Sequence, residues 1–332
     1  MSNTTEPTIK RVEQTRSAEM AIRRGKKLLS EKRFDEALNE FEQVLEQGQA
    51  TAFVHSAIGR IKFKQKDLDG ALHHFQEAIR LDPTHPQPYL RSARIYAARR
   101  DLQKAREQLE NALRVNPRSP VAHAALGQIL AREGKHEEAL AEFTKALTFN
   151  PRIMMARRLL ATTLMKMGRK AEAMNQIRAA LRIKADDPQV HAILGRLHLE
   201  EKDYDGAQRA FSEALALNPE APLTVRLGLV EAYLGAGNLG EAEKGLEAVP
   251  QREQFSPYLH KLWGDLYHAR GMHKEALEEY RAASLTVGED MGIEGLEDLD
   301  DEMIQRMATE AATAAGKFVA RKREEGQGKG GA

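Results

Sequence analysis

Residues 127–151 read GQILAREGKHEEALAEFTKALTFNP, and the spacing of small and bulky residues in this stretch decides the fold. Ala139 stands twelve residues after Gly127, Phe143 four residues later, and Ala146 three residues after that. The pattern recurs every 34 residues, with a single step of 35, and the residues equivalent to Ala139 are Ala37, Ala71, Ala105, Ala173, Ala207, Ala242 and Ala276. A fixed period of this length indicates a repeat protein whose units stack on one another.

Each repeat is predicted to contain two helices. The apolar residues around Ile129 and those around Phe143 follow a 3.6-residue period. A glycine falls between the two helices in four repeats, where a left-handed residue ends a helix without a steric clash; these are Gly134, Gly168, Gly237 and Gly271. Prolines such as Pro151 follow the second helix and disfavour its continuation.

Period and pattern together resemble the tetratricopeptide repeat, a helix-turn-helix unit. The resemblance covers residues 18–290 and implies an all-α, right-handed solenoid, a superhelix of about eight repeats. The repeats are expected to start near residues 18, 52, 86, 120, 154, 188, 223 and 257. The first and seventh repeats depart most from the family pattern.

The chain ends fall outside the repeats. Residues 1–17 are predicted to be a polar, partly disordered segment, residues 291–302 an acidic linker, and residues 325–332 a disordered tail. Residues 303–324 regain a helical pattern and are expected to form a helix that caps the last repeat, because a solenoid otherwise leaves its final apolar face in water.

Composition narrows the class further. The 332 residues include 50 Lys and Arg, 49 Asp and Glu, and no Cys. Disulfides and thiolate-bound metals are therefore excluded, and a near-neutral charge argues against nucleic-acid binding. The polar N-terminus and the lack of a long apolar run favour a cytoplasmic protein without membrane insertion.

Neither a metal site nor catalysis is predicted. Alternate repeats carry a histidine at one position, expected to be a spacer in the core, and successive members should lie on the order of 20 Å apart at the usual helix spacing; they are His55, His123, His191 and His260. No phosphate-binding loop or nucleophile constellation is evident, so the chain is interpreted as a binding protein without an enzyme activity or a cofactor.

The family resemblance implies that the ninth residue of each repeat points into a concave groove, and basic residues are frequent there and at neighbouring positions of the first helices. The predicted partner-binding residues are Arg60, Lys64, Arg94, Arg132, Arg158, Lys166 and Arg196. The groove should turn acidic at Glu231 and Asp265. No ninth position holds Asn, so the family's clamp for chaperone tails is not expected. That these charges merely form a solvated face remains the open alternative.

An acidic segment near the C-terminus has the opposite charge. Its acidic residues are Glu289, Asp290, Glu294, Glu297, Asp298, Asp300 and Asp301, interspersed with apolar residues. Two interpretations stand beside each other: the acidic segment docks on the basic groove, in the same chain or in a neighbouring copy, or it is a solvated linker.

Three functions fit the sequence. The first is an adaptor or scaffold that binds a protein or peptide segment, of acidic character, in its groove. The second is a self-assembling scaffold, a homo-oligomer built into a ring, coat or filament by head-to-tail contacts. The third, RNA binding by a helical-repeat array, is disfavoured because the basic footprint is not sustained.

Overall fold

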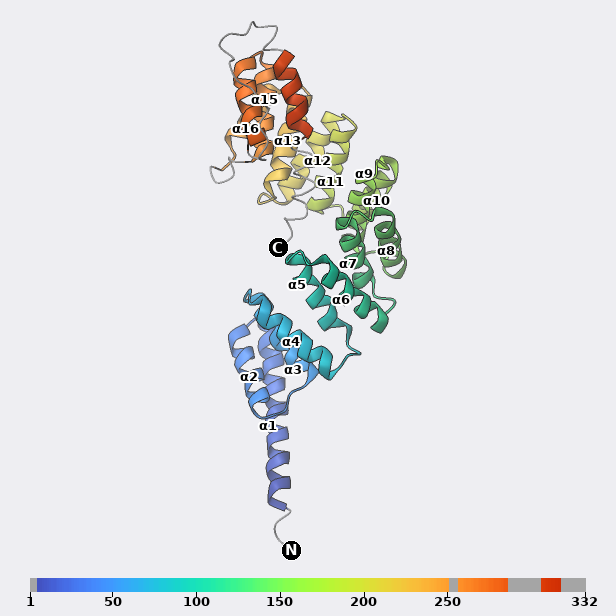
Figure 1. Cartoon of the computed structure of the whole chain (residues 1–332), viewed down its shortest axis with the longest axis vertical. Coiled ribbons are helices and arrows are strands. Elements are labelled where there is room, and N and C mark those ends of the chain that lie inside the picture. The colour runs from blue at the N-terminus through green and yellow to red at the C-terminus, as the bar shows by residue number, and fades with distance from the viewer. Residues whose placement is uncertain (1–4, 251–255, 286–305, 318–332) are drawn as a thin grey trace. The chain divides into compact units, whose positions relative to one another are not determined.

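The computed structural model describes residues 5–250, 256–285 and 306–317, and these residues form helices joined by short turns, without a β-strand among them (Figure 1). The all-α solenoid fold predicted from the repeat period is confirmed. The chain divides into two compact units, residues 1–151 and 152–332.

The first unit contains four helical hairpins, α1–α2, α3–α4, α5–α6 and α7–α8, in which the two helices lie side by side (Figure 1). The helices are α1 Thr5–Ser30, α2 Phe34–Glu46, α3 Ala52–Lys64, α4 Leu68–Leu81, α5 Pro86–Ala98, α6 Leu102–Val115, α7 Pro120–Arg132 and α8 His136–Phe149. Within the unit α2 also contacts α3, α4 contacts α5, and α6 contacts α7, so each hairpin stacks on the next.

The second unit repeats this arrangement. Its helices are α9 Met154–Lys166, α10 Lys170–Ile183, α11 Pro188–Glu200, α12 Tyr204–Leu217, α13 Leu223–Gly235, α14 Leu239–Glu247, α15 Pro257–Ala269 and α16 His273–Leu285. The first helices of repeats two to eight thus begin at the residues where the sequence period places the repeat starts. The shortest helix of the described part of this unit is α14, the second helix of the repeat that follows the 35-residue step.

In five of the eight hairpins the two helices pack through a glycine that faces an aromatic ring. A Cβ added to Gly127 would lie 2.7 Å from Cε1 of Phe143, closer than real contacts allow. The Phe143 ring is fully buried and fills the space that a side chain at Gly127 would need. The same relationship joins Gly25 to Phe41, Gly59 to Phe75, Gly195 to Phe211 and Gly264 to Tyr280. These contacts explain why small residues recur at fixed positions.

The turn between the helices uses a left-handed residue whether or not it is glycine. Gly134 has φ 78°, as predicted, and the equivalent residues Lys66 and Arg100 have φ 65° and 63°. Asp67 and Asp101 then cap the second helix by accepting hydrogen bonds from Gly70 N and Lys104 N. A capped turn therefore forms without glycine, at the cost of backbone strain.

Helices near both ends of the chain add to what the sequence predicted. Helix α1 begins at Thr5, so residues 5–17 are helical, whereas we expected a partly disordered segment before the first repeat. Residues 306–317 form a helix whose Ala308, Ala311 and Ala315 are buried against α16. This helix covers the apolar face of the last hairpin. The rest of the predicted helix 303–324, the linker and the tail lie outside the described residues.

The alternate-repeat histidines have partners that the sequence did not reveal. His123 Nδ1 lies 2.6 Å from Glu142 Oε2, and its Nε2 lies 2.9 Å from Pro117 O. His260 and Glu279 form the equivalent contact, at 2.8 Å, in the last hairpin. In each case a first-helix histidine contacts a second-helix carboxylate, so these residues hold a hairpin together as well as fill space.

Candidate protein-binding site

The seven basic residues predicted to bind a partner lie on five first helices. Arg60 and Lys64 are on α3, Arg94 on α5, and Arg132 on α7, all in the first unit. The second unit holds the other three, Arg158 and Lys166 on α9 and Arg196 on α11. Some of these residues form ion pairs or other contacts within the protein, and others have no ion pair among the described residues.

The first unit brings α3 and α5 together through an arginine and an aromatic ring. The guanidinium carbon of Arg94 lies 5.3 Å from the centre of the Phe63 ring, a cation–π contact between the two helices. Arg60 is a neighbour of both Phe63 and Lys64 on the surface of α3, because residues three or four apart lie side by side on a helix. Arg60, Lys64 and Arg94 are all exposed.

A third arginine, Arg91, completes this group and was missed by the sequence analysis. It lies one turn before Arg94 on α5, and its Nε is buried without a hydrogen-bond partner in the described part of the chain. Burial lowers the pKa of Arg91, and the positive charges of Arg60 and Arg94 lower it further. We call Arg60, Arg91 and Arg94 the arginine cluster.

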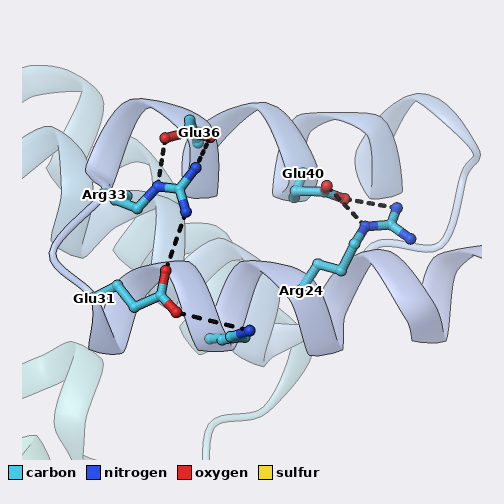
Figure 2. Close-up of polar contacts among 6 residues, drawn as sticks. Arg24, Glu31, Arg33, Glu36 and Glu40 are labelled. Atoms are coloured by element: carbon cyan, nitrogen blue, oxygen red, sulfur yellow. Dashed lines mark hydrogen bonds and ion pairs between the residues drawn. The ribbon is translucent and has the colours of Figure 1, made fainter.

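The arginine cluster has no counter-charge: within residues 5–250, 256–285 and 306–317, neither its members nor the adjacent Lys64 form an ion pair. Several other arginines of this unit are paired with carboxylates. In the first hairpin Arg24 donates two hydrogen bonds of 2.8 Å to Glu40, and Arg33 contacts Glu31 and Glu36 (Figure 2). In a chain of near-zero net charge, the arginine cluster is therefore a local concentration of uncompensated positive charge.

Two of the predicted residues are engaged within the protein. Arg158 Nη1 lies 3.0 Å from Oδ2 of Asp187, whose buried side chain also caps α11 by accepting from Gln189 N and Val190 N. Arg196 also interacts within the chain. Arg158 thus supports the junction of α9 with α11, and its predicted role in partner binding stays a prediction.

Arg132 and Lys166 have no ion pair with any described residue, but neither is seen to contact the arginine cluster. Arg132 is half-buried at the end of α7, and Lys166 is exposed at the end of α9 in the other unit. Of the seven predicted residues, Arg94 contacts the Phe63 ring, and Arg60 and Lys64 lie on the same helix as Phe63. Arg132 lies on another helix of this unit, and the remaining three belong to the second unit.

The acidic positions predicted near the C-terminal end are satisfied internally. Lys261 Nζ lies 2.5 Å from Asp265 Oδ2, and the Tyr280 hydroxyl donates a 3.0 Å hydrogen bond to Asp265 Oδ1. Burial raises the pKa of Asp265. The Tyr258 hydroxyl donates to Glu231. These carboxylates therefore belong to the packing of α13, α15 and α16.

The acidic segment at residues 289–301 lies outside the described residues. Among the described ones, no three or more His, Asp or Glu side chains are arranged to hold a metal ion. No described helix is both long and apolar enough to cross a bilayer.

The repeats match the model of a known protein family. The model of the cilia and flagella-associated protein 70 C-terminal domain, a tetratricopeptide-repeat family, matches residues 11–254. The chain belongs to this family. The resemblance to tetratricopeptide repeats is thus confirmed, and such proteins are generally non-enzymatic modules that bind protein or peptide partners. No curated protein sequence matches the chain.

Solved structures share the fold at low sequence identity. The crystal structure of the APC/C hetero-tetramer Cut9–Hcn1 matches with a TM-score of 0.65 and 15% identity over 85% of this chain and 52% of that one. A tetratricopeptide repeat protein from Parabacteroides merdae matches at 0.56 and 17% identity, over 81% and 98%. The type IV pilus biogenesis factor PilW matches at 0.59 and 20% identity, over 64% and 97%. The chain spans about half the length of the Cut9–Hcn1 chain that it matches.

Proposed function

We propose that this tetratricopeptide-repeat protein is an adaptor that binds an acidic segment of a partner protein at the arginine cluster. The observation that carries the proposal is Arg91, whose Nε is buried without a partner while Arg60 and Arg94 add like charge beside it. Burial and the like charges of Arg60 and Arg94 both disfavour the charged guanidinium of Arg91, and an acidic ligand beside the arginine cluster offsets this repulsion.

The chemistry of the site favours carboxylates and phosphates over neutral groups. A guanidinium presents several N–H donors in one plane and grips an anionic oxygen pair through charge-assisted hydrogen bonds. Phe63 holds the Arg94 guanidinium in place, which reduces the side-chain entropy lost on binding. Phe63 and Tyr96, both partly buried on the core between α4 and α5, offer apolar surface to side chains beside the acidic group.

Fluorescence anisotropy tests the proposal with a labelled, Glu-rich peptide of about twelve residues that carries a few Leu residues. The full-length chain is compared with the Arg60→Gln, Arg94→Gln double variant, in which both exposed members of the arginine cluster lose their charge. The matched control is Arg80→Gln with Arg114→Gln, which removes the same charge from exposed second-helix positions.

We expect saturable binding that weakens about tenfold or more in the cluster variant and changes little in the control. Equal losses in both variants would mean that only the net charge matters, and the proposal would be wrong. Tighter binding of single-stranded RNA than of the acidic peptide would favour the nucleic-acid reading instead.

A further inference from the structure

The arginine cluster carries more charge than a single carboxylate neutralises. Lys64, one turn from Arg60 on α3, adds a fourth positive charge to the three guanidinium groups. A Glu or Asp side chain brings one negative charge and two oxygens, so it leaves most of this charge uncompensated. A phosphorylated side chain brings a charge of about −1.5 to −2 at neutral pH and three acceptor oxygens.

The charges of the arginine cluster come from two neighbouring helices. Arg91 and Arg94 approach from α5, and Arg60 belongs to the neighbouring α3. Arg94 is held against Phe63, and the Nε of Arg91 is already removed from water. A group with oxygens in several directions reaches donors on both helices at once, whereas a planar carboxylate presents its two oxygens in one plane.

We propose that the arginine cluster binds a phosphorylated serine or threonine within the acidic segment of the partner. This inference rests on the proposed function and specifies the ligand of the same site. The mutual repulsion of the three arginines makes a doubly charged ligand more favourable, because its attraction to each guanidinium offsets the repulsion between them. Binding would thereby depend on the phosphorylation state of the partner.

The test compares three labelled peptides of one sequence that carry Ser, Glu or phosphoserine at a central position between flanking Glu and Leu residues. We expect the phosphoserine peptide to bind at least about tenfold more tightly than the Ser peptide and several-fold more tightly than the Glu peptide. Inorganic phosphate should displace it at lower concentration than chloride does. Equal affinities of the phosphoserine and Glu peptides would overturn the inference and leave the proposed function intact, whereas failure of all three would refute both.

Two variants of Arg91 locate the effect. Arg91→Lys keeps the charge but removes the buried Nε, and Arg91→Gln removes both; thermal melts establish that each variant folds. We expect the preference for phosphoserine over Glu to fall to about twofold or less in Arg91→Gln and to an intermediate value in Arg91→Lys. Full preference in a folded Arg91→Gln variant would contradict the assignment.

The pH dependence gives an independent readout. The second pKa of a phosphoserine is about 6, so affinity for this peptide should decline between about pH 7.5 and 5.5. The Glu peptide keeps its charge over this range, since the pKa of Glu is about 4.3. A parallel decline of the two peptides would place the pH dependence in the protein and count against a phosphoryl ligand.

Discussion

Gly127 and Phe143 occupy one space: the ring of Phe143 stands where a side chain at Gly127 would project. The chain varies both positions together. In the five repeats with glycine at the first position the partner is Phe or Tyr, and in the three repeats with Ala93, Ala161 or Val230 the partner is Leu109, Ile177 or Leu246. A side chain on the first helix thus goes with a smaller, non-aromatic residue on the second.

This pairing predicts a coupled effect of two substitutions. Gly127→Ala should destabilise the protein by about 1 to 3 kcal/mol, because the new Cβ lies 2.7 Å from the buried ring. Adding Phe143→Leu recreates the combination of Ala93 with Leu109 and should recover at least about 0.5 kcal/mol relative to the sum of the single effects. Denaturant unfolding of the four proteins measures this coupling, and strict additivity would contradict it.

The pair His55 and His74 predicts acid sensitivity of the second hairpin. Their Nδ1 atoms lie 3.0 Å apart, so the Nδ1 of one ring donates a hydrogen bond and the Nδ1 of the other ring accepts it and carries no proton. Burial, then His55, His73 and Lys62, lower the pKa of His74 to about 4, while the carboxylate of Asp67 acts in the opposite direction. Burial also lowers the pKa of His55, which Glu77 partly offsets.

The sign of the effect follows from proton uptake. An unfolded histidine titrates near pH 6.5, so between about pH 6.5 and 4 the unfolded chain binds more protons than the folded one. The stabilisation is complete above pH 6.5 and is lost as the pH falls toward 4. His74→Glu introduces the residue type found at Glu142 and Glu279, and should reduce the drop in melting temperature between pH 7 and 5. His85→Gln, at an exposed site, is the control; an unchanged drop in His74→Glu, or a measured pKa of His74 near 6.5, would refute this account.

Arg158 and Lys166 on α9 allow structural and binding roles to be separated. Arg158→Gln breaks the contact with the buried Asp187 and should cost about 1 to 3 kcal/mol of stability without changing the affinity for acidic peptides. Lys166→Gln should leave stability within about 0.5 kcal/mol, because its side chain is exposed and has no ion pair in the described structure. Thermal melts and peptide titrations on both variants check this, and weaker peptide binding by a stable Arg158→Gln variant would restore Arg158 to the site.

The acidic segment of the chain itself should compete for the arginine cluster. Replacing its seven carboxylates by the corresponding amides removes the charge that we expect to compete, so the affinity for an added Glu-rich peptide should rise several-fold. Light scattering over a range of concentrations then distinguishes the two docking modes. If the acidic segment docks within one chain, the substitution leaves the measured mass unchanged; if it docks on a neighbouring copy, the substitution lowers the mass. An unaltered peptide affinity would identify the acidic segment as a solvated linker.

Much of the fold follows from the sequence because the repeat period superimposes eight independent instances of one pattern. The family and the helical solenoid are confirmed on that basis. The left-handed turns at Lys66 and Arg100 were not predicted, since lysine and arginine carry no local signal for that backbone conformation. The helical residues 5–17 were missed because polar composition alone suggested disorder.

The candidate site was less accessible to sequence analysis. Arg60, Lys64 and Arg94 were predicted from positions that the family resemblance places in the groove, and their role in binding stays a prediction. Arg91 was missed since its importance depends on burial and on the approach of α5 to α3, neither of which is local in sequence. The pairing of Arg158 with Asp187 joins residues 29 positions apart, and only the structure identifies it.

Arginine side-chain NMR tests the central claim most directly, because each Nε–Hε group gives its own signal. The isotope-labelled chain is titrated with the Glu-rich peptide and then with its phosphoserine counterpart, and Arg91→Lys assigns the signal of Arg91. The account predicts saturable shifts of the Nε–Hε signals of Arg60, Arg91 and Arg94, larger with phosphoserine, while those of Arg114 and Arg158 stay in place. Peptide binding that leaves the Arg91 signal unmoved would contradict it.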